Sequence, residues 1–343
     1  MKKILLSIVV SIFIVLVSCK NDKVLLSSLF PDNEIYHLKE LNYPEDSILK
    51  PDFIYSFGDF ILLSEPKSDY LLSSYNIKTK ELNRFITKGN GPEELLDVQQ
   101  IGSFKNDNTF FAKSTFTENM FVFESVDNKI HKLSATPIPD NIVSLCTDGD
   151  LLIYSKYGDY RYSVYNNSNK SKIEFGDSIV YNNFSQNMIS RTLQGLCTNS
   201  TEKKTIAWFS IYGDAYEIYD YSDLSDIKNT KQVLSWLPSV TAQREIPVMN
   251  TDTKLGVPSV TSSDKYIYAL YSENTLMDAA TLQDDVFFCK KILVFDWEGN
   301  PVKILQIDKE LRSISFNKQQ KIIYGIGKDE NANLRIYYLD NIE

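Results

Sequence analysis

The chain has 343 residues, 43% of them hydrophobic and 13% aromatic, which is enough for two ordinary domains or one large all-β domain. Its 36 basic and 45 acidic residues give a formal net charge of −9. Because an acidic surface repels polyanions, this balance argues against a nucleic-acid-binding protein and against electrostatic attachment to anionic lipid.

The N-terminal segment, residues 1–18, predicts export. Lys2 and Lys3 precede an almost unbroken apolar run over residues 4–17, as in a secretory signal peptide. The run closes on Leu-Val-Ser-Cys at residues 16–19, which resembles the lipobox of bacterial lipoproteins and implies that Cys19 becomes the lipidated first residue. The alternative is a transmembrane anchor, but that needs about 20 apolar residues.

Removal of residues 1–18 would leave 34 basic against 45 acidic residues, a net charge of −11. We therefore expect acyl chains alone to hold the protein at the membrane, and residues 19–32 to form a lipidated tether. The polar residues 20–22 resemble a tag for export to the outer face of the outer membrane, although Asn21 stands where an acid is favoured. The sequence predicts an outer-membrane lipoprotein of the cell envelope and leaves open whether it faces the periplasm or the surface.

Six similar units follow along the chain. Each begins with a very apolar run, continues with a second strand rich in Tyr, Phe and Val, and then has a charged turn and a third strand. The apolar runs lie at residues 60–63, 109–112, 151–154, 205–208, 266–269 and 321–324. The second strands lie at residues 71–75, 120–123, 162–165, 216–219, 292–295 and 334–338.

A repeat of about 40 to 50 residues with several strands is typical of propeller blades. The units therefore predict an all-β, six-bladed β-propeller with antiparallel blades over residues 33–343. We expect the apolar runs to be the innermost strands, and residues 34–38 to supply the strand that the last blade lacks. A pair of β-sandwiches or a β-helix is the alternative.

A glycine-rich segment lies between the first and second units. Gly89, Gly91, Pro92 and Glu93 form a Gly-x-Gly-Pro-Glu sequence that predicts a rigid structural turn between blades. Phosphate binding is not indicated, because no third glycine and no strand-then-helix context follow. An apolar residue is expected soon after Glu93; Glu94 departs from this, and Leu95 can take that place.

This segment resembles the signature of the six-bladed, TolB-like β-propeller lipoproteins of Bacteroidota. Residues 292–302, an apolar strand followed by Asp, a Gly turn and Pro, are similar to a second motif of that family, and residues 314–325 continue it. The resemblance covers roughly residues 33–340. It implies a propeller fold and an envelope lipoprotein, and it carries no catalytic residues.

Few residues suggest chemistry. Cys146, Cys197 and Cys289 are widely spaced, which favours three buried thiols, with one disulfide as the alternative. His37 and His131 are the only histidines, and this scarcity argues against a metallohydrolase. No metal or other cofactor is predicted. Residues 329–333 offer oxygen ligands for calcium, but a hairpin turn is the better interpretation.

Two insertions, at residues 227–258 and 272–285, exceed what turns need, and residues 274–285 contain the one clear helical pattern. The sequence predicts a non-enzymatic binding or scaffolding module for a protein partner or a glycan. The alternative is a polysaccharide hydrolase or lyase with carboxylates at the channel mouth. A cluster of acids with His or Arg at the channel would favour the enzyme.

Overall fold

The computed structural model describes residues 24–31, 33–44, 50–91, 94–117, 119–127, 129–139, 142–176, 178–181, 184–243, 246–340 and 342. The predicted signal peptide and Cys19 lie outside these residues. Among the helices within them, none has the length and apolar character that crossing a bilayer requires.

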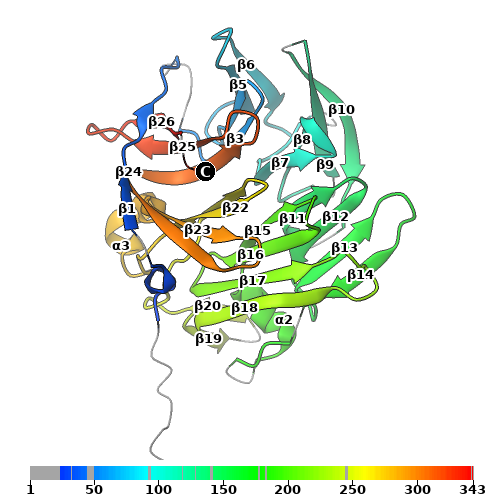
Figure 1. Ribbon diagram of the computed structural model, residues 1–343. Coiled ribbons are helices and arrows are strands. Elements are labelled where there is room, and N and C mark those ends of the chain that lie inside the picture. Colours follow the sequence, from blue (N-terminus) through cyan, green and yellow to red (C-terminus); the bar gives the residue numbers. More distant parts are fainter. Residues whose placement is uncertain are drawn as a thin grey trace, which may run out of the picture.

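The described chain forms antiparallel sheets arranged as a ring (Figure 1). Four separate sheets of four strands are blades 1 to 4. Their strands are β3 (Ile54–Phe57), β4 (Phe60–Ser64), β5 (Tyr70–Asn76) and β6 (Leu82–Thr87); β7 (Gln100–Phe104), β8 (Asn106–Lys113), β9 (Asn119–Val126) and β10 (Lys129–Pro137); β11 (Ile142–Asp148), β12 (Leu151–Lys156), β13 (Tyr162–Asn166) and β14 (Lys172–Phe175); β15 (Gly195–Ser200), β16 (Thr205–Ser210), β17 (Asp214–Asp220) and β18 (Lys228–Trp236).

An eight-stranded sheet contains blades 5 and 6, which share the 17-residue strand β24 (Pro301–Asn317). The first part of β24 pairs with β23 and is the outer strand of blade 5, and its last part pairs with β25 and is the innermost strand of blade 6. The other strands are β21 (Ser259–Ser262), β22 (Tyr266–Tyr271), β23 (Cys289–Asp296), β25 (Ile322–Lys328) and β26 (Leu334–Leu339). The predicted six-bladed propeller is thus confirmed.

The N-terminal part of the chain closes the ring through two short strands. β1 (Asn33–Tyr36) pairs parallel with Ile304–Ile307 of β24, and β2 (Lys39–Glu40) pairs antiparallel with β26. The prediction that residues 34–38 complete the last blade was therefore wrong by a few residues: Lys39–Glu40 supply that strand, while residues 33–36 extend blade 5.

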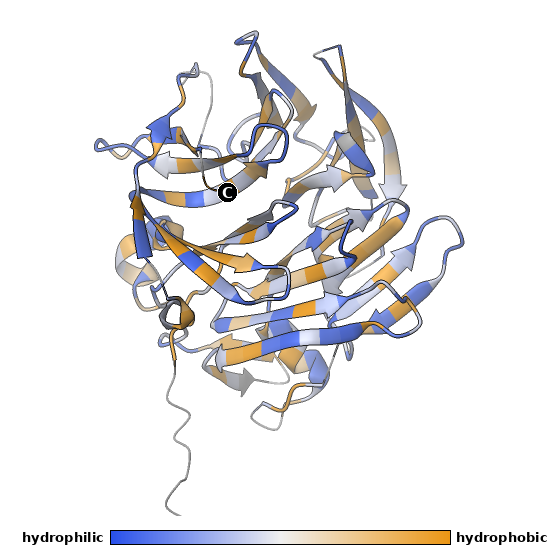
Figure 2. Ribbon diagram, in the orientation of Figure 1, coloured by the Kyte–Doolittle hydropathy of each residue, from blue (hydrophilic) through white to orange (hydrophobic). Residues whose placement is uncertain are grey.

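The apolar runs are the second strands of the blades, and the prediction that they are innermost was wrong. They correspond to β4, β8, β12, β16, β22 and β25, and all five residues of β4 and all six of β16 are buried. A second strand has partners on both sides in its own sheet and a neighbouring blade over each face, so it carries the most apolar sequence. Figure 2 shows this contrast between apolar strand centres and hydrophilic hairpin tips.

The innermost strands are instead rich in Ser and Thr, and their side chains connect neighbouring blades. The Ser56 N–H donates to Ser315 Oγ (2.8 Å), and the Ile314 N–H donates to Ser259 Oγ (3.0 Å). Further contacts of this kind lie between these and other blades. The Phe316 N–H donates to Thr261 Oγ1 between blades 6 and 5, and Thr198 Oγ1 contacts Ser262 Oγ between blades 4 and 5. The Cys197 N–H donates to Ser144 Oγ between blades 4 and 3, and the Gln100 side chain bonds the backbone of Leu145 between blades 2 and 3.

Blades 1 and 2 are held together by aromatic packing. Phe110 on β8 lies 5.2 Å from Phe57 on β3 and 5.1 Å from Phe123 on β9, measured between ring centroids. The cluster also contains apolar residues of both blades and of the segment that connects them. Burial of apolar surface therefore supplies much of the contact at this junction.

We predict that Ser259→Ala lowers the free energy of unfolding by about 1–3 kcal/mol, because the buried Ile314 N–H loses its acceptor. The matched control is Ser171→Ala, at an exposed turn before β14, which should change stability by less than about 0.5 kcal/mol. Urea unfolding monitored by tryptophan fluorescence measures both. Equal effects would show that the bridge contributes nothing specific.

Candidate functional site

A central channel of about 460 Å³ runs between the innermost strands of all six blades. Its volume lies in the range of small-molecule sites. Serine, threonine and amide side chains alternate along its wall with apolar and aromatic ones, among them Phe53, Tyr55, Phe57 and Phe316. The sequence analysis did not identify these innermost strands. The pairs Ser259/Thr261 and Ser313/Ser315, each spaced by two residues and followed by an apolar run, were a pattern that could have predicted them.

Two wall hydroxyls have capacity left for a ligand. The positions of the Thr261 and Ser313 hydroxyls are fixed, because each accepts a hydrogen bond from a backbone N–H of the next blade. A hydroxyl also carries one proton to donate, and no acceptor for these two protons is found within the described part of the chain. The wall therefore offers neutral donors at fixed positions.

The charged residues that line the channel are each paired with an opposite charge. Lys105 Nζ lies 2.7 Å from Asp150 Oδ1, Lys318 Nζ lies 3.0 Å from Asp264 Oδ1, and Asp148 accepts from Lys204 Nζ at 2.7 Å. Asp148 also accepts from the Tyr221 hydroxyl at 3.2 Å. Among the described lining residues it is the only carboxylate, so the channel is close to neutral.

Neither histidine lies at the channel. His37 is exposed and contacts Asp308 at the junction of β1 and β2, and His131 lies on β10, the outer strand of blade 2. In the described ranges, no group of three or more His, Cys, Asp or Glu is placed to hold a metal ion. Asp329 accepts from the Asn331 and Asn333 N–H groups, so residues 329–333 form the predicted hairpin turn between β25 and β26.

The three described cysteines are buried and form no disulfide. Cys146 and Cys197 lie on neighbouring innermost strands within one apolar cluster, and Cys289 begins β23. Burial raises the pKa of the Cys197 and Cys289 thiols to about 12, so both are protonated at neutral pH. They pack as small apolar groups.

The glycine-rich segment forms a close connection between blades 1 and 2. The Gly91 N–H donates to Glu94 Oε2 (2.8 Å), and a Cβ on Gly89 would lie 2.0 Å from the same carboxylate oxygen. Leu95 is buried in the aromatic cluster between the blades and takes the apolar place that Glu94 does not fill. Pro92 and Glu93 lie outside the described residues.

A buried lysine at the end of β8 lies next to the channel wall. Lys113 Nζ donates to Gln99 Oε1 (2.7 Å), a residue of that wall, and Asp97 lies nearby, where it accepts from Thr115. Burial lowers the pKa of Lys113 to about 8, and the Asp97 carboxylate opposes this shift. The sequence analysis missed this residue, because a lone lysine in a strand carries no pattern.

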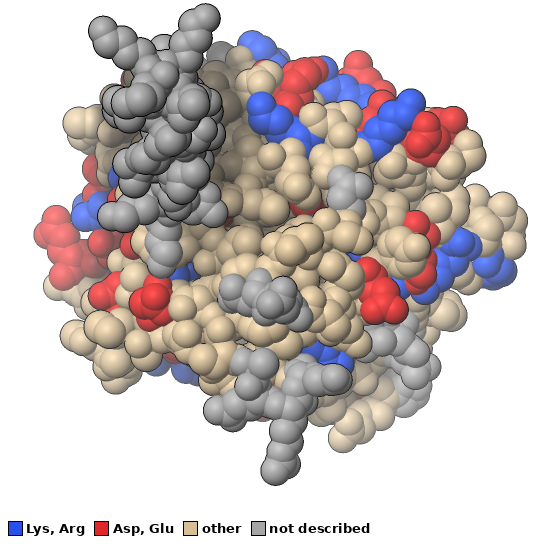
Figure 3. All heavy atoms as spheres, turned by 90° about the horizontal axis from the view of Figure 1, so that it is seen from below, with Lys and Arg blue, Asp and Glu red and all other residues tan. Residues whose placement is uncertain are grey.

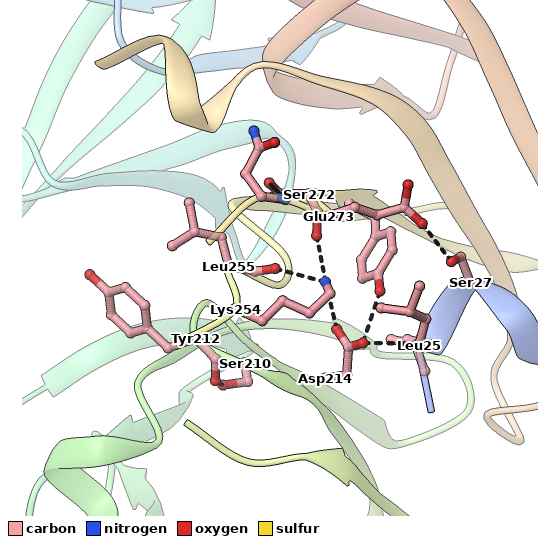
Figure 4. Close-up of polar contacts among 12 residues, drawn as sticks. Leu25, Ser27, Ser210, Tyr212, Asp214, Lys254, Leu255, Ser272 and Glu273 are labelled. Carbon is pink, nitrogen blue, oxygen red and sulfur yellow. Dashed lines mark hydrogen bonds and ion pairs between the residues drawn. The ribbon is translucent and has the colours of Figure 1, made fainter. Parts of the chain in front are cut away.

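The N-terminal segment docks against blades 4 and 5 through a buried ion pair (Figure 4). Lys254 Nζ lies 3.0 Å from Asp214 Oδ1, and Asp214 Oδ2 accepts from the Tyr271 hydroxyl (2.9 Å) and the Leu26 N–H (3.0 Å). Ser27 Oγ donates to Glu273 Oε1 (2.9 Å). Burial raises the pKa of Asp214 and lowers that of Lys254, while each charge opposes the other's shift.

Leu26 belongs to the 3-10 helix η1 (Leu26–Leu29) and is buried among apolar residues of both blades. The described part of the predicted tether, residues 24–31, is therefore packed onto the propeller. The sequence contained no signal for this, since Leu26, Asp214 and Lys254 come from three segments that are far apart in the chain.

Three insertions extend from one side of blades 3 to 5. They contain α2 (Gln186–Thr192), the hairpin of β19 (Val240–Gln243) and β20 (Ile246–Met249), and α3 (Ala279–Leu282) with the 3-10 helix η3 (Gln283–Phe287). The predicted helical segment at 274–285 is helical only in its second part, from Ala279 onward. The helix α2 was missed, although Ser185 caps it by accepting from the Met188 N–H. The predicted insertion at 227–258 begins only after β18, which is the regular outer strand of blade 4.

Six four-stranded antiparallel blades around a polar channel define the chain as a six-bladed β-propeller. A family model described as "TolB-like 6-blade propeller-like" matches residues 31–319. The chain therefore belongs to this TolB-like propeller family, which confirms the family assignment made from the sequence.

Solved structures show the same fold. A member of the DUF4221 family from Bacteroides vulgatus matches with a TM-score of 0.57 and 8% identity, covering 88% of this chain and 96% of that one. A putative exported protein from Bacteroides fragilis matches with a TM-score of 0.54 and 12% identity, covering 92% and 96%. A search of curated proteins by sequence finds no match.

We predict that Gly89→Ala and Glu94→Ala each lower the free energy of unfolding by about 1 kcal/mol, because either change removes the contact between Glu94 and the Gly91 N–H. The double variant should be no less stable than Glu94→Ala alone, since the added methyl then has nothing to displace. Urea unfolding of all three proteins gives the coupling. Additive losses would contradict the role assigned to Glu94.

We also predict that Lys113 makes the protein more stable as the pH rises from about 8 to 10. The folded-state pKa is about 8 against an ordinary value of 10.5, so the unfolded chain binds more protons in this range. The contribution is at most about 1.4 kcal/mol per pH unit. The difference in unfolding free energy between wild type and Lys113→Met should therefore increase between pH 8 and 10, by up to this amount per pH unit. Parallel stability profiles of the two proteins would refute the role of Lys113.

Proposed function

We propose that this protein is a lipoprotein of the cell envelope, anchored through Cys19, whose propeller is a non-enzymatic module that binds a neutral glycan in its central channel. The observation that carries the proposal is the channel wall, which combines uncharged hydroxyl and amide groups with aromatic rings around about 460 Å³.

A neutral wall of this kind suits a polyhydroxylated ligand. Sugar hydroxyl groups donate and accept hydrogen bonds without carrying charge, and the protons of Thr261 and Ser313 are available to them. Phe53, which is partly exposed at the channel, offers an apolar ring face. Pockets that hold small ligands generally combine apolar walls with a few fixed polar groups.

The alternative, a polysaccharide hydrolase or lyase, requires catalytic groups in the channel. Glycoside cleavage ordinarily uses two carboxyl groups about 5–10 Å apart, one of them able to act as an acid. Asp148 is the single carboxylate on the described channel wall, and it is held by Lys204 and Tyr221. The binding module is therefore the better supported function.

The envelope location is supported by the lipobox-like residues 16–19 and by the basic and apolar residues before them. A structural neighbour described as a putative exported protein is consistent with it. The membrane would be reached through the lipid on Cys19, at the outer membrane, and nucleic acid is disfavoured by the acidic composition.

We predict that Leu196→Trp, on the innermost strand β15, fills the channel and weakens binding of neutral oligosaccharides at least 10-fold. The matched control is Leu133→Trp on the outer strand β10, where the side chain is exposed, and binding should be unchanged. An oligosaccharide array followed by calorimetry on the soluble form from residue 20 measures both, with thermal unfolding to verify folding. Binding that survives Leu196→Trp would exclude the channel.

A further inference from the structure

The insertions of blades 3, 4 and 5 contact one another and form one continuous surface, here called the insertion rim (residues 178–194, 237–258 and 272–288, where described). The Tyr181 hydroxyl donates to the Pro238 carbonyl, which joins the first insertion to the second. The Met277 N–H donates to the Thr251 carbonyl (2.8 Å), which joins the second to the third.

The insertion rim exposes large apolar side chains. Val180 is 91% exposed, Met277 61% and Ile246 58%, and Val248 and Leu282 are also exposed. Figure 3 views the molecule from the lower side of Figure 1, where α2, β19 and β20 lie. Charged side chains gather mainly toward the edges of this face, and its middle is formed largely by uncharged residues.

The docked N-terminal segment leaves the propeller beside this rim. Ser27 contacts Glu273, which precedes Met277 in the third insertion, and Leu26 is held by Asp214, whose partner Lys254 lies in the second insertion. The docking contacts are the ones drawn in Figure 4. The insertion rim and the point where the chain departs are thus one region of the surface.

The distance from this point to the lipid on Cys19 is short. Val24, the first described residue, follows Cys19 closely in the sequence, and so short a chain spans at most about 18 Å. A lipid anchor would hold the docked segment, and the rim beside it, within that distance of the bilayer.

We propose that the insertion rim is a membrane-contact surface, whose exposed apolar side chains rest in the headgroup region of the bilayer that holds the lipid anchor. Partial burial of such side chains at the interface is favourable, and it adds to the acyl chains rather than replacing them. Because the chain is acidic, contact depends on apolar side chains and does not require anionic lipid. The inference rests on the lipid attachment in the proposed function, and not on glycan binding.

The test uses the full-length protein, isolated from cells and placed in phosphatidylethanolamine and phosphatidylcholine vesicles. Met277→Cys and Ile246→Cys on the rim, and Val126→Cys on the exposed end of β9 in blade 2 as the control, are each labelled with an environment-sensitive fluorophore. The native cysteines described are buried, so labelling is selective. Spin-labelled lipid in the vesicles then quenches the fluorescence of any label that lies at the bilayer. Lipid attachment at Cys19 is measured separately, by palmitate incorporation into the wild type and into Cys19→Ala.

We expect quenching at positions 277 and 246 to exceed that at position 126 by roughly fivefold or more, because only side chains at the headgroup region approach the spin label. Two results would overturn the membrane-contact surface and leave the rim to a protein partner. One is equal quenching at all three positions, and the other is no quenching at the rim positions of a protein that does incorporate palmitate. Lack of palmitate in the wild type would overturn the anchor and the surface together. Glycan binding is measured in the soluble form, so its outcome is independent of both.

Discussion

The ring depends on how the innermost strand of each blade satisfies its free edge. Such a strand pairs on one side only, and the N–H and C=O groups on its other side face the neighbouring blade. Here the hydroxyls of Ser259, Ser144 and Ser313 accept from those N–H groups, so at these three junctions one blade completes the polar requirements of its neighbour. The same residues give the channel its neutral, hydroxyl-rich wall. Stability of the ring and the chemistry of the candidate site are therefore two results of one set of side chains.

The junction of blades 1 and 2 relies more on apolar packing. Aromatic rings around Phe110, together with the buried Leu95, hold the two blades. The Gly-x-Gly segment acts here by letting the Glu94 carboxylate fold back onto the chain. The two glycines of this segment are thus explained by packing, and the segment leads into β7, whose first residue Gln100 lies on the channel wall.

The fold could be predicted because its signal is repeated: six apolar runs, each followed by an aromatic strand, leave few architectures open. The assignment of the innermost strands failed because burial, not position in the ring, decides which strand is most apolar. Ser259 and Ser315 look like loop residues until it is known that they face another blade's backbone. The docking of Leu26 on Asp214 and Lys254 could not be predicted at all, since it joins three distant segments through one buried charge pair whose members carry no local pattern.

The closing strands of the ring have a consequence for folding. β1 and β2 are among the first strands of the chain, and their partners, Ile304–Ile307 and β26, are separated from them by almost the whole propeller. Contacts between such distant segments form late, because a long loop must be closed before they add stability. Blades 5 and 6 share β24 without an intervening loop, so the N-terminal segment, which is made first, stays unpaired until both blades have formed. Until the last strand emerges, the newly made ring stays open, and the chain presents unpaired strand edges at both ends, the state in which it is most exposed to misassembly.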